Sequence, residues 1–243
     1  MPHDPSSQEL KAYASGGFFL VKREKLQGGL EDPEARLPDP FFSASDLCEF
    51  LPGAWAYSWI RTEPKERVLK AREFGIREEQ IAQIVKWVTA KQLNHELGLI
   101  SVFSSGELAR QFLRVFDIPR DDLVLFGIGL HPKHLKAFEE DARPAPGYGD
   151  YGIHEMVTEE TPLPTGGTIC GFEPLEYELG SFHSWLCCYA HKEASKKYSI
   201  RPNQFGFISD FDDACRISEA LTNGILPAEP GTYFPWIIAV YPL

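Results

Sequence analysis

The sequence has few basic residues for its acidic content. Its 243 residues include 24 Lys and Arg against 35 Asp and Glu, which gives a formal net charge of −11 at pH 7. Because contacts with nucleic-acid phosphates need a surplus of cationic side chains, this balance argues against a nucleic-acid partner. The shortage is greatest between Pro144 and His191, where neither Lys nor Arg occurs. That stretch nevertheless contains seven acidic residues: Asp150, Glu155, Glu159, Glu160, Glu173, Glu176 and Glu178.

Long apolar runs are also missing. The N-terminal run from Phe18 to Val21 has four residues, whereas a signal peptide needs an apolar core of about 7–15. The stretch from Tyr233 to Leu243 carries no charge, but it has eleven residues and two prolines. A membrane-spanning helix needs about 20 apolar residues. We therefore expect a soluble protein with no membrane partner.

Cysteine is scarce and its spacing is not that of a disulfide framework or a zinc finger. The five cysteines are an odd number, and no two of them form a Cys-x-x-Cys pair. Adjacent cysteines such as Cys187 and Cys188 rarely pair with each other. The pattern favours free, mostly buried thiols in a reducing compartment, so we expect a cytoplasmic location. The cysteines are Cys48, Cys170, Cys187, Cys188 and Cys215.

Nucleotide-binding motifs are incomplete. The segment Gly127-Ile128-Gly129 lacks the third glycine and the acidic residue of a dinucleotide-binding turn, and no Gly-Lys-Ser/Thr follows it. We therefore expect no nucleotide site there.

Apolar periodicity predicts an α+β protein with helices packed on a central sheet. Residues 123–130 are apolar at both parities, which predicts a central strand covered on both faces. We also expect a helix start at Ser104, with Glu107 completing a capping box, and another after Ser209. Further strands are predicted near 18–24, 99–103, 168–172, 205–209 and 236–241, and an extension of the range 168–172 to 178 stays open. Helices are predicted near 63–73, 77–97, 182–198 and 210–222, and residues 55–60 form a strand or short helix.

Two segments rich in Pro and Gly, 142–152 and 158–167, interrupt this pattern. The sequence predicts either a single α+β domain over 1–243 or an N-terminal lobe over 1–141 and a C-terminal lobe over 153–243.

The segment 182–198 contains the strongest candidate for chemistry. On a helix, His183, Cys187 and His191 would lie at i, i+4 and i+8 on one face. Imidazole and thiolate are preferred zinc ligands, so His183 and Cys187 together with an outside ligand could hold zinc. Alternatively, a histidine one turn away could deprotonate Cys187 as a nucleophile. A third interpretation is packing, because half-buried histidines and thiols commonly border an apolar helix face. Packing is the interpretation that we favour.

Three glutamates precede this segment, and they allow three interpretations. On a strand, Glu176 and Glu178 share one face. Paired carboxylates can act as an acid and a base when burial separates their pKa values. They can equally form a solvated strand edge that discourages aggregation. In a region without basic residues, they can also belong to an acidic surface that binds a basic partner.

Two further groups have simple structural explanations. His131 and His134 follow the predicted central strand, where ligands often bind in α/β sheets, but Pro132 makes His131 a natural helix start. The acids at 210, 212 and 213 suit the positive end of a helix better than a calcium site.

These patterns predict a cytosolic acidic binding or inhibitor protein that captures a basic protein and has no catalysis of its own. Immunity proteins that neutralise basic nuclease toxins share this charge logic, but no motif here identifies such a family. The predicted binding residues are Asp150, Glu159, Glu160, Glu173, Glu176 and Glu178. The alternative is a hydrolase in which Cys187, His183 and Glu176 are catalytic, or in which His183 and Cys187 bind zinc.

Overall fold

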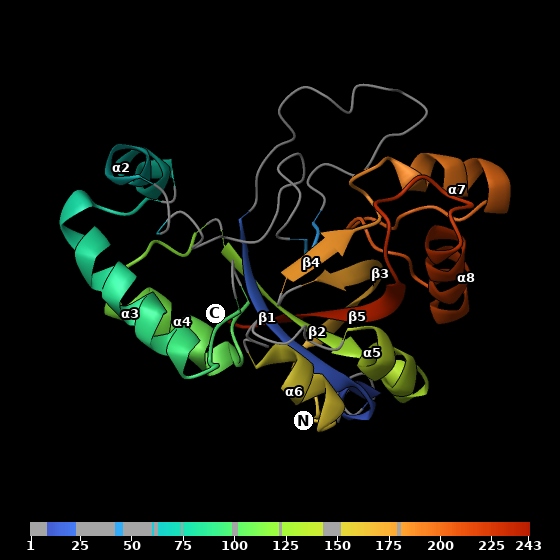
Figure 1. Ribbon diagram of the computed structural model, residues 1–243, viewed down its shortest axis with the longest axis horizontal. Coiled ribbons are helices and arrows are strands. Elements are labelled where there is room, and N and C mark those ends of the chain that lie inside the picture. Colours follow the sequence, from blue (N-terminus) through green and yellow to red (C-terminus); the bar gives the residue numbers. More distant parts are fainter. Residues whose placement is uncertain are drawn as a thin grey trace.

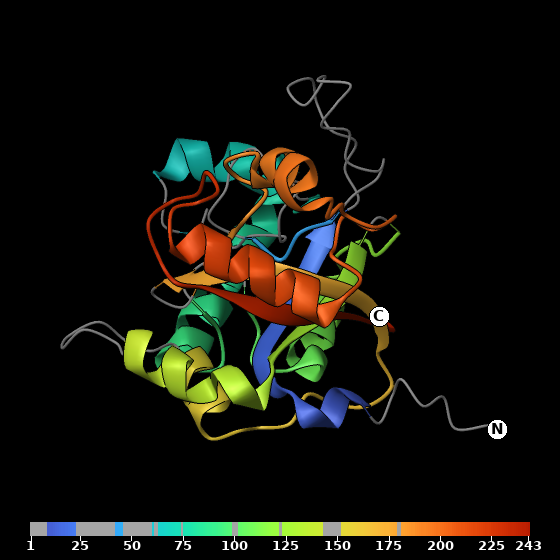
Figure 2. The ribbon, with the colours of Figure 1, turned by 90° about the vertical axis from the view of Figure 1, so that its right-hand side faces the viewer.

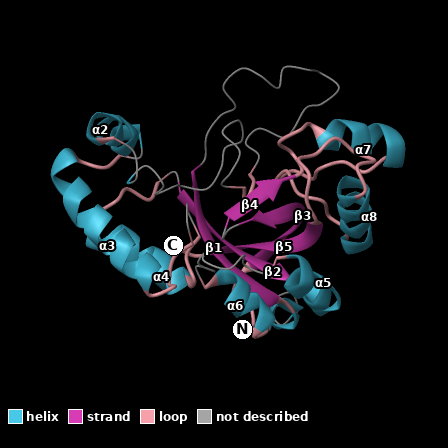
Figure 3. Cartoon of the chain, viewed as in Figure 1, coloured by secondary structure: helices cyan, strands magenta, loops and turns pink. Residues whose placement is uncertain are grey.

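The computed structural model describes residues 9–22, 42–45, 60, 63–73, 75–98, 102–121, 123–142, 152–178 and 181–243. These residues form a five-stranded antiparallel sheet with the strand order β1-β2-β5-β3-β4, surrounded by helices (Figures 1 and 3). The strands are β1 (Ala14–Lys22), β2 (Leu123–Leu130), β3 (Thr168–Glu178), β4 (Ser181–Ser184) and β5 (Tyr233–Tyr241). The predicted α+β fold with helices packed on a central sheet is confirmed.

Helices cover both faces of the sheet because the strands bury side chains on both sides. Phe18 of β1 faces a core shared with α4 and α8, whereas Phe19 faces a second core shared with α5 and α6. The first core also contains residues of α3 and α7. The helices are α2 (Pro64–Glu73), α3 (Ile81–Leu93), α4 (Gly106–Val115), α5 (Leu135–Asp141), α6 (Ile153–Thr158), α7 (Ala190–Tyr198) and α8 (Phe211–Thr222).

β2 is the buried inner strand that its composition predicts. It lies between β1 and β5, and its last six residues are buried. Its glycines permit close packing of aromatic rings, because a Cβ on Gly127 would lie 2.6 Å from the Tyr241 ring. A Cβ on Gly129 would lie 2.9 Å from Cβ of Tyr13. Sterics within the core therefore explain the two glycines.

Strands from both sides of the first Pro/Gly-rich segment belong to one sheet. β2 precedes this segment and pairs with β5 near the C-terminus. Residues 143–151 of the segment lie outside the described residues. No helix in the described part of the chain combines the length and apolar character that crossing a bilayer requires.

The predicted helix over 182–198 is wrong in its first half. Residues 181–184 form β4, which pairs with β3 through Tyr177–Phe182 and Glu176–His183. A turn follows, and Tyr189 adopts a left-handed φ of 58° immediately before α7. Pairing with β3 satisfies the backbone of 181–184, and this tertiary contact outweighs the local helical pattern.

Other boundaries differ by smaller amounts. The helix caps are Ser105 and Asp210 rather than Ser104 and Ser209, and their side chains accept hydrogen bonds from the amides of Leu108 and Asp213. The predicted strand at 205–209 is a turn with one bridge to β3. The sequence pattern missed α6 entirely. Residues 55–59 and 99–101 lie outside the described residues.

Candidate functional site

Glu173 points into the second core and does not reach the surface. It is fully buried, and its carboxyl accepts hydrogen bonds from Ser43 Oγ (2.6 Å), Ser184 Oγ (2.6 Å) and the Ala44 amide (2.8 Å). Burial raises the pKa of Glu173 to about 7, against an opposing effect of these hydrogen bonds. The side chain fastens residues 43 and 44 to the sheet, so it does not contribute to a partner-binding surface.

Glu176 lies on the opposite face of β3, as the alternation of a strand requires. Its direct partner across the β3–β4 pair is His183, and His183 Nδ1 lies 3.9 Å from Glu176 Oε2. That distance is too long for a hydrogen bond. Both side chains are largely buried, with 12% of Glu176 and 17% of His183 exposed. The sheet therefore brings together two of the three predicted catalytic residues.

Acidic groups surround this pair. Burial, followed by the charge of Glu178, raises the pKa of Glu176 to about 7. His183 opposes that rise, whereas Asp141 and Glu229 add to it. Asp141 ends α5 and accepts a hydrogen bond at 2.8 Å from Thr232 Oγ1, immediately before β5. No sequence pattern points to Asp141 or Glu229, because only the sheet topology brings them close to β3.

Tyr233 connects the glutamates with the two adjacent cysteines. It pairs with Glu176 across β3 and β5. Burial raises the pKa of Tyr233, and the nearby charges of Glu176, Cys187 and Cys188 raise it further. Cys188 Sγ lies 3.9 Å from Oε1 of Glu229. Both thiols are half-buried in the turn after β4.

The single helical row of His183, Cys187 and His191 does not exist. His183 is on β4, Cys187 is in the turn, and His191 is buried at the start of α7. The His191 ring stands edge-on to Trp185 with centroids 6.3 Å apart. Within the described ranges, no three His, Cys, Asp or Glu side chains lie close enough together to hold a metal ion. The structure therefore gives the zinc alternative no support.

The exposed predicted acids lie in two neighbouring places. Glu178 is exposed at the end of β3, and Glu159 and Glu160 are exposed after α6. Asp150 lies outside the described residues. α6 contacts α5, where the Phe138 ring stacks on His154 with centroids 5.6 Å apart. Figure 2 shows α5 and α6 below the end of β3 on the same side of the molecule.

We call the acidic residues of α5, of α6 and its end, of the end of β3 and of the loop at Glu229 the acidic rim. Asp141 joins its two parts, because it belongs to α5 and acts electrostatically on Glu176. Lys136 is the only lysine or arginine in α5, α6 and β3. Its Nζ lies 3.9 Å from Oε1 of Glu140. The acidic rim consists of Glu139, Glu140, Asp141, Glu155, Glu159, Glu160, Glu176, Glu178 and Glu229.

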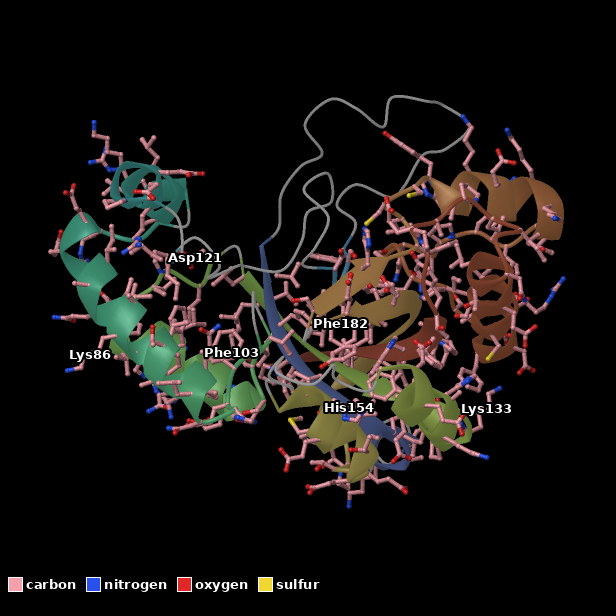
Figure 4. The ribbon with its side chains drawn as sticks, viewed as in Figure 1. Lys86, Phe103, Asp121, Lys133, His154 and Phe182 are labelled. Atoms are coloured by element: carbon pink, nitrogen blue, oxygen red, sulfur yellow. The ribbon has the colours of Figure 1, made fainter. Side chains whose placement is uncertain are left out.

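A second polar cluster lies at the end of β2, and the sequence pattern detected half of it. His131 caps the 3₁₀ turn Pro132–His134 as predicted, because its Nδ1 accepts a hydrogen bond from the Lys133 amide. His134 Nε2 lies 3.8 Å from Sγ of Cys215 on α8. Lys133, at the edge of the molecule in Figure 4, lies with its Nζ 4.2 Å from the Phe211 ring centre.

This cluster holds an electrically neutral thiol–imidazole pair. Burial lowers the pKa of His134 to about 4 and raises the pKa of Cys215 despite the nearby Lys133. A thiolate is the reactive form of cysteine. The geometry therefore describes a protected thiol rather than an activated nucleophile.

Comparisons with known protein families, curated proteins and solved structures gave no match to this chain.

Proposed function

We propose that this protein binds a basic protein partner through the acidic rim and has no catalysis of its own. One observation supports the proposal: α5, α6 and its end, β3 and the loop before β5 carry eight exposed acidic residues and the largely buried Glu176, whereas Lys136 is the only lysine or arginine in α5, α6 and β3. Glu173 takes no part, because it is fully buried and its carboxyl is held by Ser43, Ala44 and Ser184.

The clustering of carboxyl groups does not stabilise the free protein, but it favours association with a cationic partner. Like charges held together repel each other in the free protein, and a cationic partner relieves that repulsion. Complementary charge also accelerates encounter and disfavours wrong partners. The side chains of Glu139, Glu159 and Glu160 are exposed, and so they are available to such a partner.

Calorimetry with a nona-arginine peptide tests this proposal. In the rim variant, Glu139, Glu159 and Glu160 are each changed to Lys. In a matched control, Glu63, Asp121 and Glu219 are changed to Lys; these residues are equally exposed and lie outside the acidic rim. Figure 4 places Asp121 on the α2–α4 side of the molecule, away from α5 and α6. Both variants alter the net charge by the same amount.

We expect the rim variant to bind the peptide at least about tenfold more weakly than the control variant. Raising NaCl from about 50 to about 200 mM should strongly weaken peptide binding by the wild type and should change peptide binding by the rim variant little. Equal weakening of the two variants would show that net charge alone attracts the peptide, and the proposal would then fail.

Hydrolysis is a second candidate function, favoured by the contact between Glu176 and His183. A carboxyl with a pKa of about 7 next to an imidazole can carry a proton at neutral pH. In this alternative, Cys187→Ser abolishes turnover in a screen of ester and peptide substrates. If binding is the function, Cys187→Ser has a mild effect on nona-arginine affinity.

A further inference from the structure

Residues 42–45, which we call the strap, are bound to the sheet by contacts with segments far away in the sequence. All four residues are buried, and the Phe42 amide donates to the Phe205 carbonyl at 3.0 Å. Ser45 Oγ donates to the Phe182 carbonyl of β4 at 3.1 Å. β4 is the last strand in the order of the described sheet, so the strap contacts an edge strand.

One carboxyl group connects the strap with two strands. Glu173 of β3 accepts hydrogen bonds from Ser43 Oγ and from the Ala44 amide, which both belong to the strap. It accepts a third from Ser184 Oγ of β4. Ser43 Oγ in turn accepts the Ser45 amide at 3.0 Å. The polar contacts of the strap therefore converge on the Glu173 carboxyl.

No cation balances this carboxyl in the part of the chain that the structure describes. Within those residues, no lysine, arginine or histidine forms an ion pair with Glu173, and the charged side chains of α5 and α6 are exposed. Four other titratable side chains border the second core, from β3, α6 and the turn before α5: Cys170, Tyr177, His134 and His154. The causes of the Glu173 pKa shift are burial and the three hydrogen bonds, and none of these four groups contributes.

Ionisation of Glu173 therefore opposes attachment of the strap. Burial disfavours the charged form of a carboxyl group, and the three hydrogen bonds offset this only in part, because the pKa of Glu173 is still raised to about 7. When the strap detaches, water reaches the carboxyl and its pKa falls towards the ordinary 4.5. The attached state is fully favoured below pH 4.5 and loses this advantage as pH rises through 7.

We infer that Glu173 makes the strap a pH-sensitive switch, which stays attached to β3 and β4 while the carboxyl is protonated and detaches when it ionises. Detachment also removes Ser45 Oγ from the Phe182 carbonyl and so uncovers the edge of β4. The switch is independent of the proposed function, because Glu173 lies on the opposite face of β3 from Glu176 and takes no part in the acidic rim.

Hydrogen exchange of the Ala44 amide, followed by NMR between pH 5.5 and 8, tests the switch. Each rate is divided into the rate of an unstructured peptide of the same sequence at the same pH, which gives a protection factor. We expect the protection factor of Ala44 to fall by at least about tenfold over this range. The two pKa values of 4.5 and about 7 set an upper limit of about 300-fold.

Low concentrations of urea distinguish detachment of the strap from unfolding of the whole protein. The Phe18 amide, which donates to the Phe103 carbonyl at 2.8 Å, is the reference for global unfolding. At pH 7.5, Ala44 should exchange faster than Phe18, and urea should accelerate exchange at Phe18 much more than at Ala44, because local opening exposes little surface. Equal protection and equal urea dependence at the two amides would overturn the inference.

Two variants assign the pH dependence to Glu173. Glu173→Gln retains acceptors but cannot ionise, so the protection factor of Ala44 should not change with pH. Ser43→Ala retains the carboxyl but removes one donor, so protection should be lower at every pH and should still fall as pH rises. Thermal unfolding confirms that both variants fold. A protection factor independent of pH in the wild type, or the same pH dependence in Glu173→Gln, would contradict the switch.

Discussion

Two glutamates three positions apart on β3 have opposite environments. Glu173 points into the second core and is held by two serine hydroxyls and an amide, whereas Glu176 points to the other face among carboxylates. The alternation of a strand separates them, and this could be predicted from the sequence. The burial of Glu173 could not, because its donors Ser43 and Ala44 lie about 130 residues earlier in the chain.

Glu173 should make stability depend on pH. Its folded pKa of about 7 is raised above the ordinary 4.5. Its contribution to stability is therefore complete below pH 4.5 and is lost as pH rises through 7. The difference between these pKa values corresponds to about 3 kcal/mol. In urea unfolding, the stability of wild type relative to Glu173→Gln should fall by about that amount between pH 4.5 and 8.

Glu178→Gln is the matched control, because Glu178 is an exposed glutamate on the same strand. Its stability relative to wild type should change little over this pH range. A flat difference curve for Glu173→Gln would mean that the Glu173 carboxyl is not buried as described.

At the level of elements, the apolar periodicity of the sequence predicts where helices and strands lie better than it predicts where they begin and end. The strand 123–130 and the helix 63–73 were anticipated from apolar pattern and capping residues, and β2 and α2 occupy those ranges. The helix predicted from residue 182 is wrong in its first half, because pairing with β3 decides the conformation of β4. A helix and a short edge strand can share the same local pattern, and long-range pairing is not visible in it.

The start of α8 offers a direct test of a corrected cap. Asp210 Oδ1 accepts the Asp213 amide at 3.0 Å. Asp210→Ala should lower the free energy of unfolding by about 1 kcal/mol, because it leaves that amide without its acceptor. Ser209→Ala should change it by less than about 0.5 kcal/mol. If urea unfolding shows that the two variants lose equal amounts of unfolding free energy, Ser209 shares the capping role.

The inner strand β2 should not tolerate an added methyl group at Gly127. Gly127→Ala should destabilise the protein by about 1–3 kcal/mol, because the new Cβ would press on the Tyr241 ring. Gly106→Ala is the control, since a Cβ there would meet neighbours at 3.4 Å or more and the residue begins a helix. It should alter the unfolding free energy by less than about 0.5 kcal/mol. If Gly127→Ala lowers the unfolding free energy by less than about 0.5 kcal/mol, the packing between β1, β2 and β5 is looser than described.

On the scale of the whole molecule, the charge pattern was visible in the sequence but its location was not. The run without Lys or Arg pointed to β3, and two of the three glutamates there are buried. The exposed surface instead continues onto α5 and α6, because these helices pack under the sheet beside the end of β3 (Figure 1). Composition can identify an acidic region, but only the fold shows which carboxyl groups face solvent.

Amide chemical-shift mapping with nona-arginine tests the central claim most directly. The isotope-labelled protein is titrated at about 50 mM NaCl, a salt concentration at which surface charges are only partly screened. We predict saturable shifts concentrated in α5, α6, the end of β3 and the loop around Glu229, and small shifts in α2, α3 and α4. Shifts concentrated in α2–α4, or spread evenly over the described surface, would contradict binding through the acidic rim.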